Sequence, residues 1–333
     1  MANENFKRAE SRVAMKIFLT GATGVIGRRL LPILGAAGQQ VTAVARSPSA
    51  RTRLQRHGVT TIEVDLFNAD AVRRAVTGHD VVVNLATHIP SSTLQIFLRS
   101  AWRENDRLRR VASATLVDAA LAAGVARFVQ ESFAPVYPDC GERWIDETER
   151  IEPVRYNRTV ADAEASATRF SQSGGSGIVL RFGGFYGPDA FQTVAMMQAV
   201  RRGWAPMPGS PDAFVSSVTH HDAATAVAAA LDLPAGIYNV VDDEPLTHRE
   251  FFDSLAAALS VAPPRLPPPW ITPLLGSLGE MAARSVRISN RKLRAACDWR
   301  PKYASVRQGW PAVIAEMHAS TAPEHQAAAS GGL

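Results

Sequence analysis

The sequence predicts an α/β fold, a doubly wound parallel sheet followed by a smaller and discontinuous C-terminal lobe. Three observations predict it. Short β-branched runs alternate with helical stretches through the first half of the 333-residue chain, as in successive β-α-β units. One run, VVVNLA at 81–86, is almost wholly apolar, which is typical of a strand covered by helices on both faces. The first run ends in a glycine-rich turn that leads into the first helix.

The expected elements follow one another in a regular order. The predicted strands are Lys16–Thr20, Val41–Ala45, Thr61–Val64, Val81–Ala86, Arg127–Glu131, Ile178–Arg181 and Gly236–Val241. The predicted helices are Val25–Ala37, Ala69–Val76 and a long helix that ends near Ala123. Gly38 and Gly124 follow two of these helices, at positions where left-handed C-caps belong.

Composition shifts divide the chain into segments. Residues 1–14 are polar and charged, and we expect a flexible leader. Residues 15–188 carry the alternating pattern of the sheet domain, to which later residues around 214–242 are expected to return. Pro- and Gly-rich stretches within 189–318 indicate a smaller lobe, mainly for a substrate. Residues 319–333 are small and polar, which predicts a disordered tail.

Charge and cysteine usage exclude several classes of protein. The chain has 36 basic and 31 acidic residues, and its arginines are scattered, so we expect no nucleic-acid partner. No apolar run is long enough for a membrane span, which predicts no membrane association. Cys140 and Cys297 form no CxxC pair, so we expect a reducing, cytoplasmic location. His220 and His221 are adjacent without an evident third ligand, which predicts no metal site.

The segment MKIFLTGATGVIGRRLLPIL carries the strongest functional signal. Gly21 permits a tight turn, Gly24 lets the backbone approach a pyrophosphate, and Gly27 lets helix and strand pack closely. An ordinary strand-to-helix turn is the alternative, but further β-α units follow and favour a Rossmann-type dinucleotide site. The phosphates would lie at the positive end of the helix. The predicted contacts of this turn are Gly21, Thr23, Gly24, Val25, Ile26 and Gly27.

The ends of the second to fourth strands complete the predicted cofactor site. No carboxylate follows the second strand, in VTAVARSPSARTR, whereas Arg46, Arg51 and Arg53 offer guanidinium groups for a 2′-phosphate. NADP(H) is therefore favoured and NAD(H) remains an alternative, because surface arginines are common in this chain. The remaining predicted cofactor contacts follow the third and fourth strands and are Asp65, Leu66, Leu85, Ala86 and Thr87.

Three later segments extend the comparison to almost the whole chain. They are RFGGFYGP at 181–188, GIYNV at 236–240 and KLRAACDWRPKYASVRQG at 292–309. With these motifs and the glycine turn, the chain resembles the extended short-chain dehydrogenase/reductases, the NAD-dependent epimerase/dehydratase family, from about residue 15 to 310. The resemblance implies an NAD(P)-binding Rossmann domain and an oxidoreductase that acts on a small molecule. It also allows a homodimer.

The resemblance implies catalytic residues that this chain carries only in part. Family members usually have a tyrosine followed four positions later by lysine, with a serine or threonine on the reacting oxygen. Tyr156 stands at the tyrosine position, but Val160 stands at the lysine position. Phe133 occupies the serine position, with Ser132 one residue earlier, and Arg109 occupies that of an asparagine. The chain thus resembles an atypical branch without the lysine, with Tyr156 and Ser132 as its catalytic candidates.

Loss of the lysine changes the direction of reaction that the site favours. Without a nearby ammonium, the pKa of a phenol stays near about 10 and the phenol is protonated at neutral pH. Such a phenol can donate a proton to a carbonyl, but it cannot readily act as a base. Arg109 is a candidate for the missing positive charge. The substrate or a water is an alternative proton source, and Tyr156 would then only pack over the nicotinamide.

The candidates for the substrate cleft are His88, Arg109, Phe133, Phe185 and Tyr186. His88 follows the fourth strand and could donate a proton, although an ordinary loop role fits it too. Nucleotide-sugar enzymes of the family commonly have an arginine where this chain has Val215, which weighs against such a substrate.

The leading hypothesis is an NADP(H)-dependent reductase of a carbonyl compound or an activated double bond. A nucleotide-sugar epimerase or dehydratase is one alternative, weakened by Val160 and Val215. A cofactor-binding redox sensor without turnover is the other.

Overall fold

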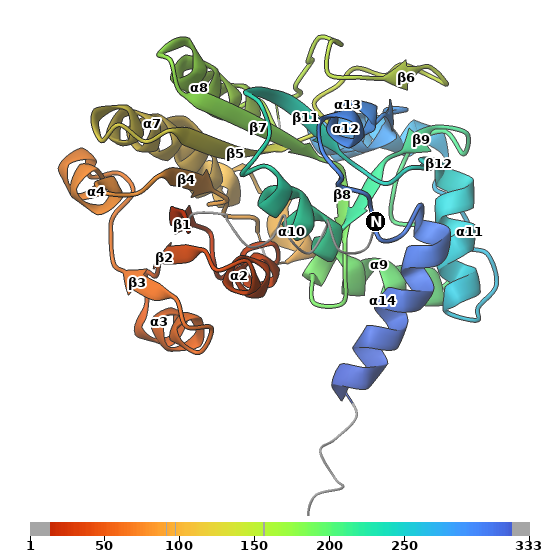
Figure 1. Ribbon diagram of the computed structural model, residues 1–333. Coiled ribbons are helices and arrows are strands. Elements are labelled where there is room, and N and C mark those ends of the chain that lie inside the picture. The colour runs from red at the N-terminus through yellow and green to blue at the C-terminus, as the bar shows by residue number, and fades with distance from the viewer. Residues whose placement is uncertain (1–13, 91, 97, 156, 322–333) are drawn as a thin grey trace, which may run out of the picture.

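A parallel sheet of seven strands forms the centre of the molecule (Figure 1). The computed structural model describes residues 14–321, apart from 91, 97 and 156. From one edge of the sheet to the other, the strands are β11 (Gly236–Val240), β7 (Ser176–Phe182), β5 (Arg127–Phe133), β4 (Val81–Asn84), β1 (Lys16–Thr20), β2 (Gln40–Val44) and β3 (Thr60–Ile62). Every neighbouring pair is parallel. The doubly wound fold predicted from the sequence is therefore confirmed.

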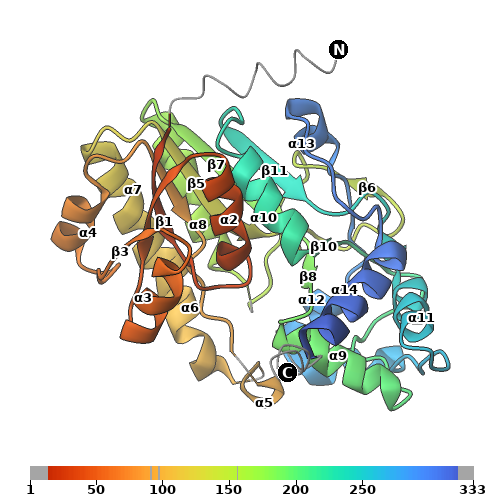
Figure 2. The ribbon, with the colours of Figure 1, turned by 60° about the horizontal axis from the view of Figure 1, so that its bottom comes forward.

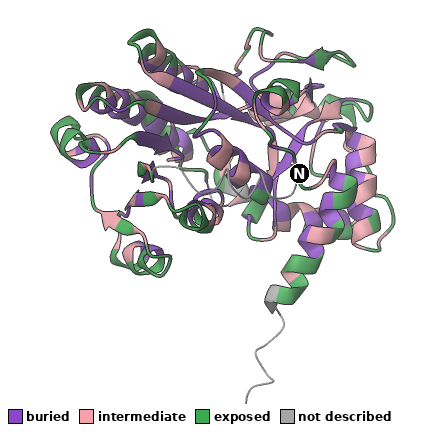
Figure 3. Ribbon diagram, viewed as in Figure 1, coloured by how far each residue is buried: buried purple, intermediate pink, exposed green. Residues whose placement is uncertain are grey.

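Alternation along the central strands directs side chains into two cores. In β1, Ile17 and Leu19 enter the core on one face and Phe18 enters the core on the other, each fully buried. Val83 and Val82 divide in the same way in β4. Figure 3 shows the consequence, a sheet whose strands are buried almost throughout their length. Burial on both faces is the reason that the middle of these strands is apolar at consecutive positions.

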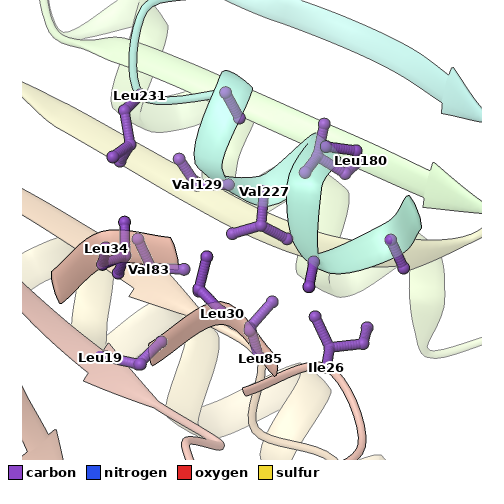
Figure 4. Close-up of a cluster of buried hydrophobic side chains, with 14 of the residues drawn as sticks. Leu19, Ile26, Leu30, Leu34, Val83, Leu85, Val129, Leu180, Val227 and Leu231 are labelled. Carbon is purple, nitrogen blue, oxygen red and sulfur yellow. The ribbon is translucent and has the colours of Figure 1, made fainter. Parts of the chain in front are cut away.

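Helices cover both faces of the sheet. One face is packed by α2 (Gly27–Ala36) and α10 (His220–Ala229), whose side chains meet those of β1, β4, β5 and β7 in the cluster drawn in Figure 4. At its edge lies α3 (Pro48–Gln55). The other face is packed by α4 (Ala69–Val76), α7 (Ser113–Ala122) and α8 (Val160–Gln172). A segment of short helices leads from β4 to α7: α5 (Thr93–Ile96), η1 (Arg99–Trp102), α6 (Arg103–Arg107) and η2 (Leu108–Ala112).

The second lobe is assembled from discontinuous pieces beside the end of the sheet (Figures 1 and 2). Its helices are α9 (Phe191–Arg201), α11 (His248–Ala258), η3 (Pro269–Leu275), α12 (Gly276–Ala283), α13 (Arg291–Ala296) and α14 (Val306–Thr321). Its short strands pair as β8 (Gly184–Tyr186) with β10 (Ser217–Thr219), β9 (Phe214–Val215) with β12 (Leu246–Thr247), and β6 (Trp144–Ile145) with β13 (Arg287–Ile288). The rings of Phe251 and Trp310, 5.6 Å apart, join α11 to α14 in its core.

The last helix corrects one predicted boundary. Helix α14 continues to Thr321, three residues into the segment 319–333 that the sequence predicts to be a disordered tail. The residues Ala319 to Thr321 contain no helix breaker, and the first proline of this segment is Pro323. The leader 1–13 and the rest of the tail lie outside the described residues. Within the described part of the chain, no helix is both long and apolar enough to cross a membrane.

Candidate cofactor and active site

The glycine turn between β1 and α2 leaves no room for side chains. Gly21 has a φ of +71°, in the left-handed region, and a Cβ there would lie 2.3 Å from the carbonyl oxygen of Leu85. A Cβ on Gly27 would lie 2.4 Å from the carbonyl oxygen of Gly21. The amide of Gly24 donates to that same oxygen at 3.0 Å and closes the turn. This geometry lets a phosphate approach the backbone at the start of α2.

A cavity of about 490 Å³ opens beside this turn, at the end of the sheet where β1, β2 and β4 finish. Dinucleotides bind at this end of doubly wound sheets. The structure places eight of the predicted cofactor residues along the cavity wall: Gly21, Thr23, Gly24, Arg46, Leu66, Leu85, Ala86 and Thr87. The volume lies within the usual range for small-molecule sites, about 300–1,000 Å³. The cavity and the glycine cradle therefore fit a nicotinamide dinucleotide.

Three other predicted cofactor residues have their side chains elsewhere. Ile26 is buried in the hydrophobic core and Val25 packs against that core, because they lie on the side of the turn that faces the sheet. Asp65 accepts a hydrogen bond from the amide of Phe67 at 3.0 Å, which holds its carboxylate in the turn after β3. Val25 and Ile26 can therefore contact the cofactor through their backbone N–H groups. Asp65 is exposed and can accept a further hydrogen bond, so its predicted cofactor contact stays a prediction.

Two arginines at the cavity have no acidic partner. Arg46 follows β2 and Arg53 lies on α3; both are exposed, both line the cavity, and neither forms an ion pair with any described residue. Arg51 was an equal candidate from the sequence, but its guanidinium bonds the carboxylate of Glu63 at 2.8 Å and is absent from the cavity wall. The correction follows from helical geometry, since residues two positions apart on α3 point about 200° apart.

A buried amide network supports the loop that forms one wall of the cavity. The side chain of Asn84, at the end of β4, accepts a hydrogen bond from the Thr20 hydroxyl at 2.6 Å and donates to Gln130 at 2.9 Å. It also donates to Ser113 at 3.2 Å and accepts from the amide of Ala86 at 3.3 Å. These hydrogen bonds connect the loop at 85–87 to β1, β5 and α7, and so hold the loop in position.

The structure changes the picture of the catalytic residues. Tyr156 lies outside the described residues. Val160, at the family's lysine position, is the first residue of α8 and is fully buried. The hydroxyl of Ser132 donates to the carboxylate of Glu164 at 2.5 Å, and that carboxylate also holds Arg181 through bonds of 2.7 and 2.8 Å. Ser132 is thus part of a buried network in this structure, and its predicted catalytic role stays a prediction.

Arg109 lies in a π-helical turn, η2, and is buried against Glu131 at the end of β5. The two side chains meet at 3.2 Å, and Arg109 Nε and Glu131 Oε2 have no hydrogen-bond partner. Its positive charge is therefore balanced within the protein. Phe133, two residues after Glu131, is half-buried. His88 is exposed, and its backbone amide donates to Asn105 Oδ1 at 2.9 Å.

Phe185 and Tyr186, two of the five residues predicted for the substrate cleft, pack against other aromatic rings in this structure. They are neighbours on β8 and point to opposite sides. Phe185 packs against the rings of Phe182 and His220, with centroids 5.4 and 6.1 Å away. Tyr186 packs against Trp310 at 4.6 Å, and burial raises the pKa of its phenol well above the usual value. Both sides of β8 are covered because it runs between the sheet domain and the lobe.

Other cavity residues were not predicted as contacts. They are Thr20, Val44, Ser47, Ala50 and Leu108. Thr20 and Val44 end β1 and β2, so their place at strand ends is a signal that the sequence does contain. Leu108 comes from a helix distant in sequence, and no local pattern points to it.

The histidine pair at the start of α10 has no metal-binding geometry. His220 is buried, meets Asp189 at 3.2 Å, and burial lowers the pKa of its imidazole. Its neighbour His221 is exposed. Among the residues that the structure describes, no group of three or more His, Cys, Asp or Glu side chains is placed to hold a metal ion.

Comparison with known proteins agrees with this site. The family model described as NAD(P)H-binding matches residues 21–234. The chain belongs to this NAD(P)H-binding family. It is an NAD(P)-dependent oxidoreductase, and its resemblance to the extended short-chain dehydrogenase/reductases is confirmed. It is similar to a 3-diazoavenalumate denitrifying reductase of a Streptomyces species, 31% identical over 309 residues, which are 89% of this chain and 99% of the relative.

Two solved structures show the same fold at low identity. A human epimerase family protein determined with NADPH has a TM-score of 0.76 and 21% identity, covering 90% of this chain and 99% of its own. A dTDP-glucose 4,6-dehydratase from Streptomyces venezuelae determined with NAD has a TM-score of 0.73 and 18% identity, covering 92% and 98%.

Proposed function

We propose that this chain is an NADPH-dependent reductase of a small organic molecule. A bound nicotinamide cofactor supplies a hydride. The chain's own contribution begins with Gly21 and Gly27, whose missing side chains let the backbone approach the pyrophosphate. Arg46 and Arg53 line the cavity with two guanidinium groups that can bind a 2′-phosphate, and no carboxylate follows β2 to hold a ribose hydroxyl instead.

The valine at position 160 is the observation that favours reduction over oxidation. The family's lysine is replaced by a fully buried valine, and Ser132 is engaged with Glu164. Neither group can lower the pKa of a neighbouring phenol, so these two positions do not help to form a base that could oxidise an alcohol. An electron-poor carbonyl carbon or activated double bond can accept hydride and take its proton from a phenol or from water. An epimerase needs both directions and is disfavoured.

Val160 is also compatible with a second class of hydride acceptor, beside carbonyl compounds and activated double bonds. The Streptomyces relative is named for the reductive loss of nitrogen from a diazo compound. When hydride replaces dinitrogen on the carbon of an aryl diazonium ion, no proton is taken up. Such a reaction needs neither the lysine nor the serine. Aryl diazonium ions therefore stand beside carbonyl compounds as candidate acceptors.

The test is a turnover assay with NADPH and four acceptors: an aromatic ketone, an enone, an aryl diazonium ion and UDP-glucose. NADPH consumption is followed by absorbance and products by mass spectrometry, with enzyme-free controls because diazonium ions also react unaided. We expect stoichiometric NADPH consumption with one of the first three. Conversion of UDP-glucose without net consumption would indicate an epimerase, and cofactor binding with no turnover would indicate a sensor; either result overturns the proposal.

A further inference from the structure

A second and larger cavity, here called the arginine cavity, lies between the segment α5–α6 and the start of α12. Its volume is about 650 Å³. Its wall includes Arg99, Arg103, Arg155 and Arg158 from the sheet domain, and residues 275–278 from the second lobe. Arg155 and Arg158 flank in sequence the position of the family tyrosine, Tyr156. This position between the lobes, next to the expected reactive centre, makes it the natural substrate site of the proposed reductase.

The charge of the arginine cavity is strongly one-sided. Four guanidinium groups share the wall with one carboxylate, Asp106. Asp106 Oδ1 accepts a hydrogen bond from the Thr159 hydroxyl at 2.9 Å. Across the described residues, no ion pair or hydrogen bond forms to any of the four guanidinium groups. Arginines elsewhere on the neighbouring helices find carboxylates, as Arg110 does with Asp162 at 3.3 Å.

Four like charges around one hollow repel one another and raise the positive potential inside it. An anionic group within the hollow relieves that repulsion. Guanidinium groups bind carboxylates and phosphates through paired, charge-assisted hydrogen bonds, so an oxyanion is the complementary ligand.

The remainder of the wall is mostly apolar, with Ser277 as its polar residue. It contains Ile96, Trp102, Leu275 and Leu278. Trp102 is buried, with 8% of its surface exposed, and its indole N–H donates to the carbonyl of Ile96 at 2.9 Å. The ring is thereby held in one orientation and can present its carbon surface to a ligand. A ligand that matches the whole wall carries one oxyanionic group on an apolar body.

We propose that the arginine cavity binds an organic acid, an aromatic or aliphatic body bearing a carboxylate, and that this is the substrate class of the reductase. That the bound acid is a substrate rests on the proposed reductase function. That the cavity binds such an acid does not. A carboxylate is chosen over a phosphate ester because a singly charged group loses less hydration free energy on entering a hollow whose wall is partly apolar.

The test measures binding without turnover, by calorimetric titration of the protein loaded with NADP⁺, which has no hydride to transfer. The probes are trans-cinnamate, its neutral analogue cinnamamide, and phenyl phosphate. We expect cinnamate to bind at least tenfold more tightly than cinnamamide. Arg155→Gln combined with Arg158→Gln should raise the Kd for cinnamate at least tenfold and abolish this difference. Arg74→Gln, a control at an exposed arginine on α4 outside the cavity, should change nothing.

Each other outcome overturns the proposal. Equal binding of cinnamate and cinnamamide, no binding of cinnamate, or no effect of the double substitution would remove the role of the arginines. Tighter binding of phenyl phosphate than of cinnamate would replace the carboxylate by a phosphate. An NADPH titration of every variant checks that the fold and cofactor site are intact. If cinnamate binds but no acceptor is reduced, the binding site is supported and the reductase function is refuted. If an acceptor is reduced but cinnamate does not bind, the reductase function is supported and this binding site is refuted.

Discussion

The buried ion pair between Glu164 of α8 and Arg181 of β7 tests which contacts hold the end of β5 in place. Glu164 and Arg181 are 7% and 4% exposed and are joined by two hydrogen bonds of 2.7 and 2.8 Å. The same carboxylate accepts the hydroxyl of Ser132. Glu164→Gln keeps the size of the side chain but leaves the guanidinium buried without a counter-charge. Breaking a buried pair in this way costs about 3–5 kcal/mol of unfolding free energy.

The same helix supplies the matched control. Arg169 of α8 meets Asp118 of α7 at 2.6 Å, but these side chains are 43% and 66% exposed. Asp118→Asn should therefore cost less than about 1 kcal/mol. Urea unfolding at pH 7 measures both losses against a total stability of about 5–15 kcal/mol. If Glu164→Gln lost no more stability than Asp118→Asn, the assignment of the buried network as the anchor of this strand end would be refuted.

Two further predictions concern the glycine turn and a buried histidine. Gly27→Ala places a methyl group 2.4 Å from the Gly21 carbonyl oxygen, so we expect the free energy of unfolding to fall by about 1–3 kcal/mol and NADPH to bind much more weakly. The control is Gly35→Ala, which has open space around it and should stabilise α2 by about 0.5–1 kcal/mol. Unchanged NADPH binding by Gly27→Ala would count against the tight turn. Burial lowers the pKa of His248 to about 4, so the unfolded chain alone takes up its proton as pH falls from about 6.5 to 4. The free energy of unfolding should therefore fall by up to about 3 kcal/mol between pH 7 and pH 4, as measured by denaturation at the two pH values. In His248→Leu this fall should be smaller. A fall of equal size in this variant would exclude His248 as its source.

The sheet and the glycine turn could be predicted because their signals are local. Strand β1 has the bounds predicted for it, Lys16–Thr20, since four apolar or β-branched residues follow Lys16 and end at a glycine. The contact that requires a glycine at Gly27 is local, with Gly21 and Ala22, whereas the one at Gly21 is with Leu85 in the loop after β4. Apolar runs of this kind leave few alternatives to a strand buried on both faces.

The side-chain contacts of the site depend on how elements are rotated, and the sequence did not specify that. Arg51 and Arg53 are equivalent in the sequence, and only the orientation of α3 directs Arg53 to the cavity and Arg51 to Glu63. Tyr186 is an apolar aromatic near a cleft by position, but Trp310, more than a hundred residues away, covers it. The arginine cavity escaped prediction for the same reason, since its wall joins segments from both lobes.

The most direct test of the central claim is a fluorescence titration with NADPH and NADH. The variants are Arg46→Ala combined with Arg53→Ala, and Arg51→Ala as the control that is paired with Glu63. Charge-assisted bonds to a 2′-phosphate are each equivalent to about tenfold to a hundredfold in affinity. We predict that the wild-type protein prefers NADPH, that the double variant loses this preference while its NADH affinity is unchanged, and that Arg51→Ala retains it. Equal affinity of the wild-type protein for both cofactors, or a double variant that still prefers NADPH, would contradict the account.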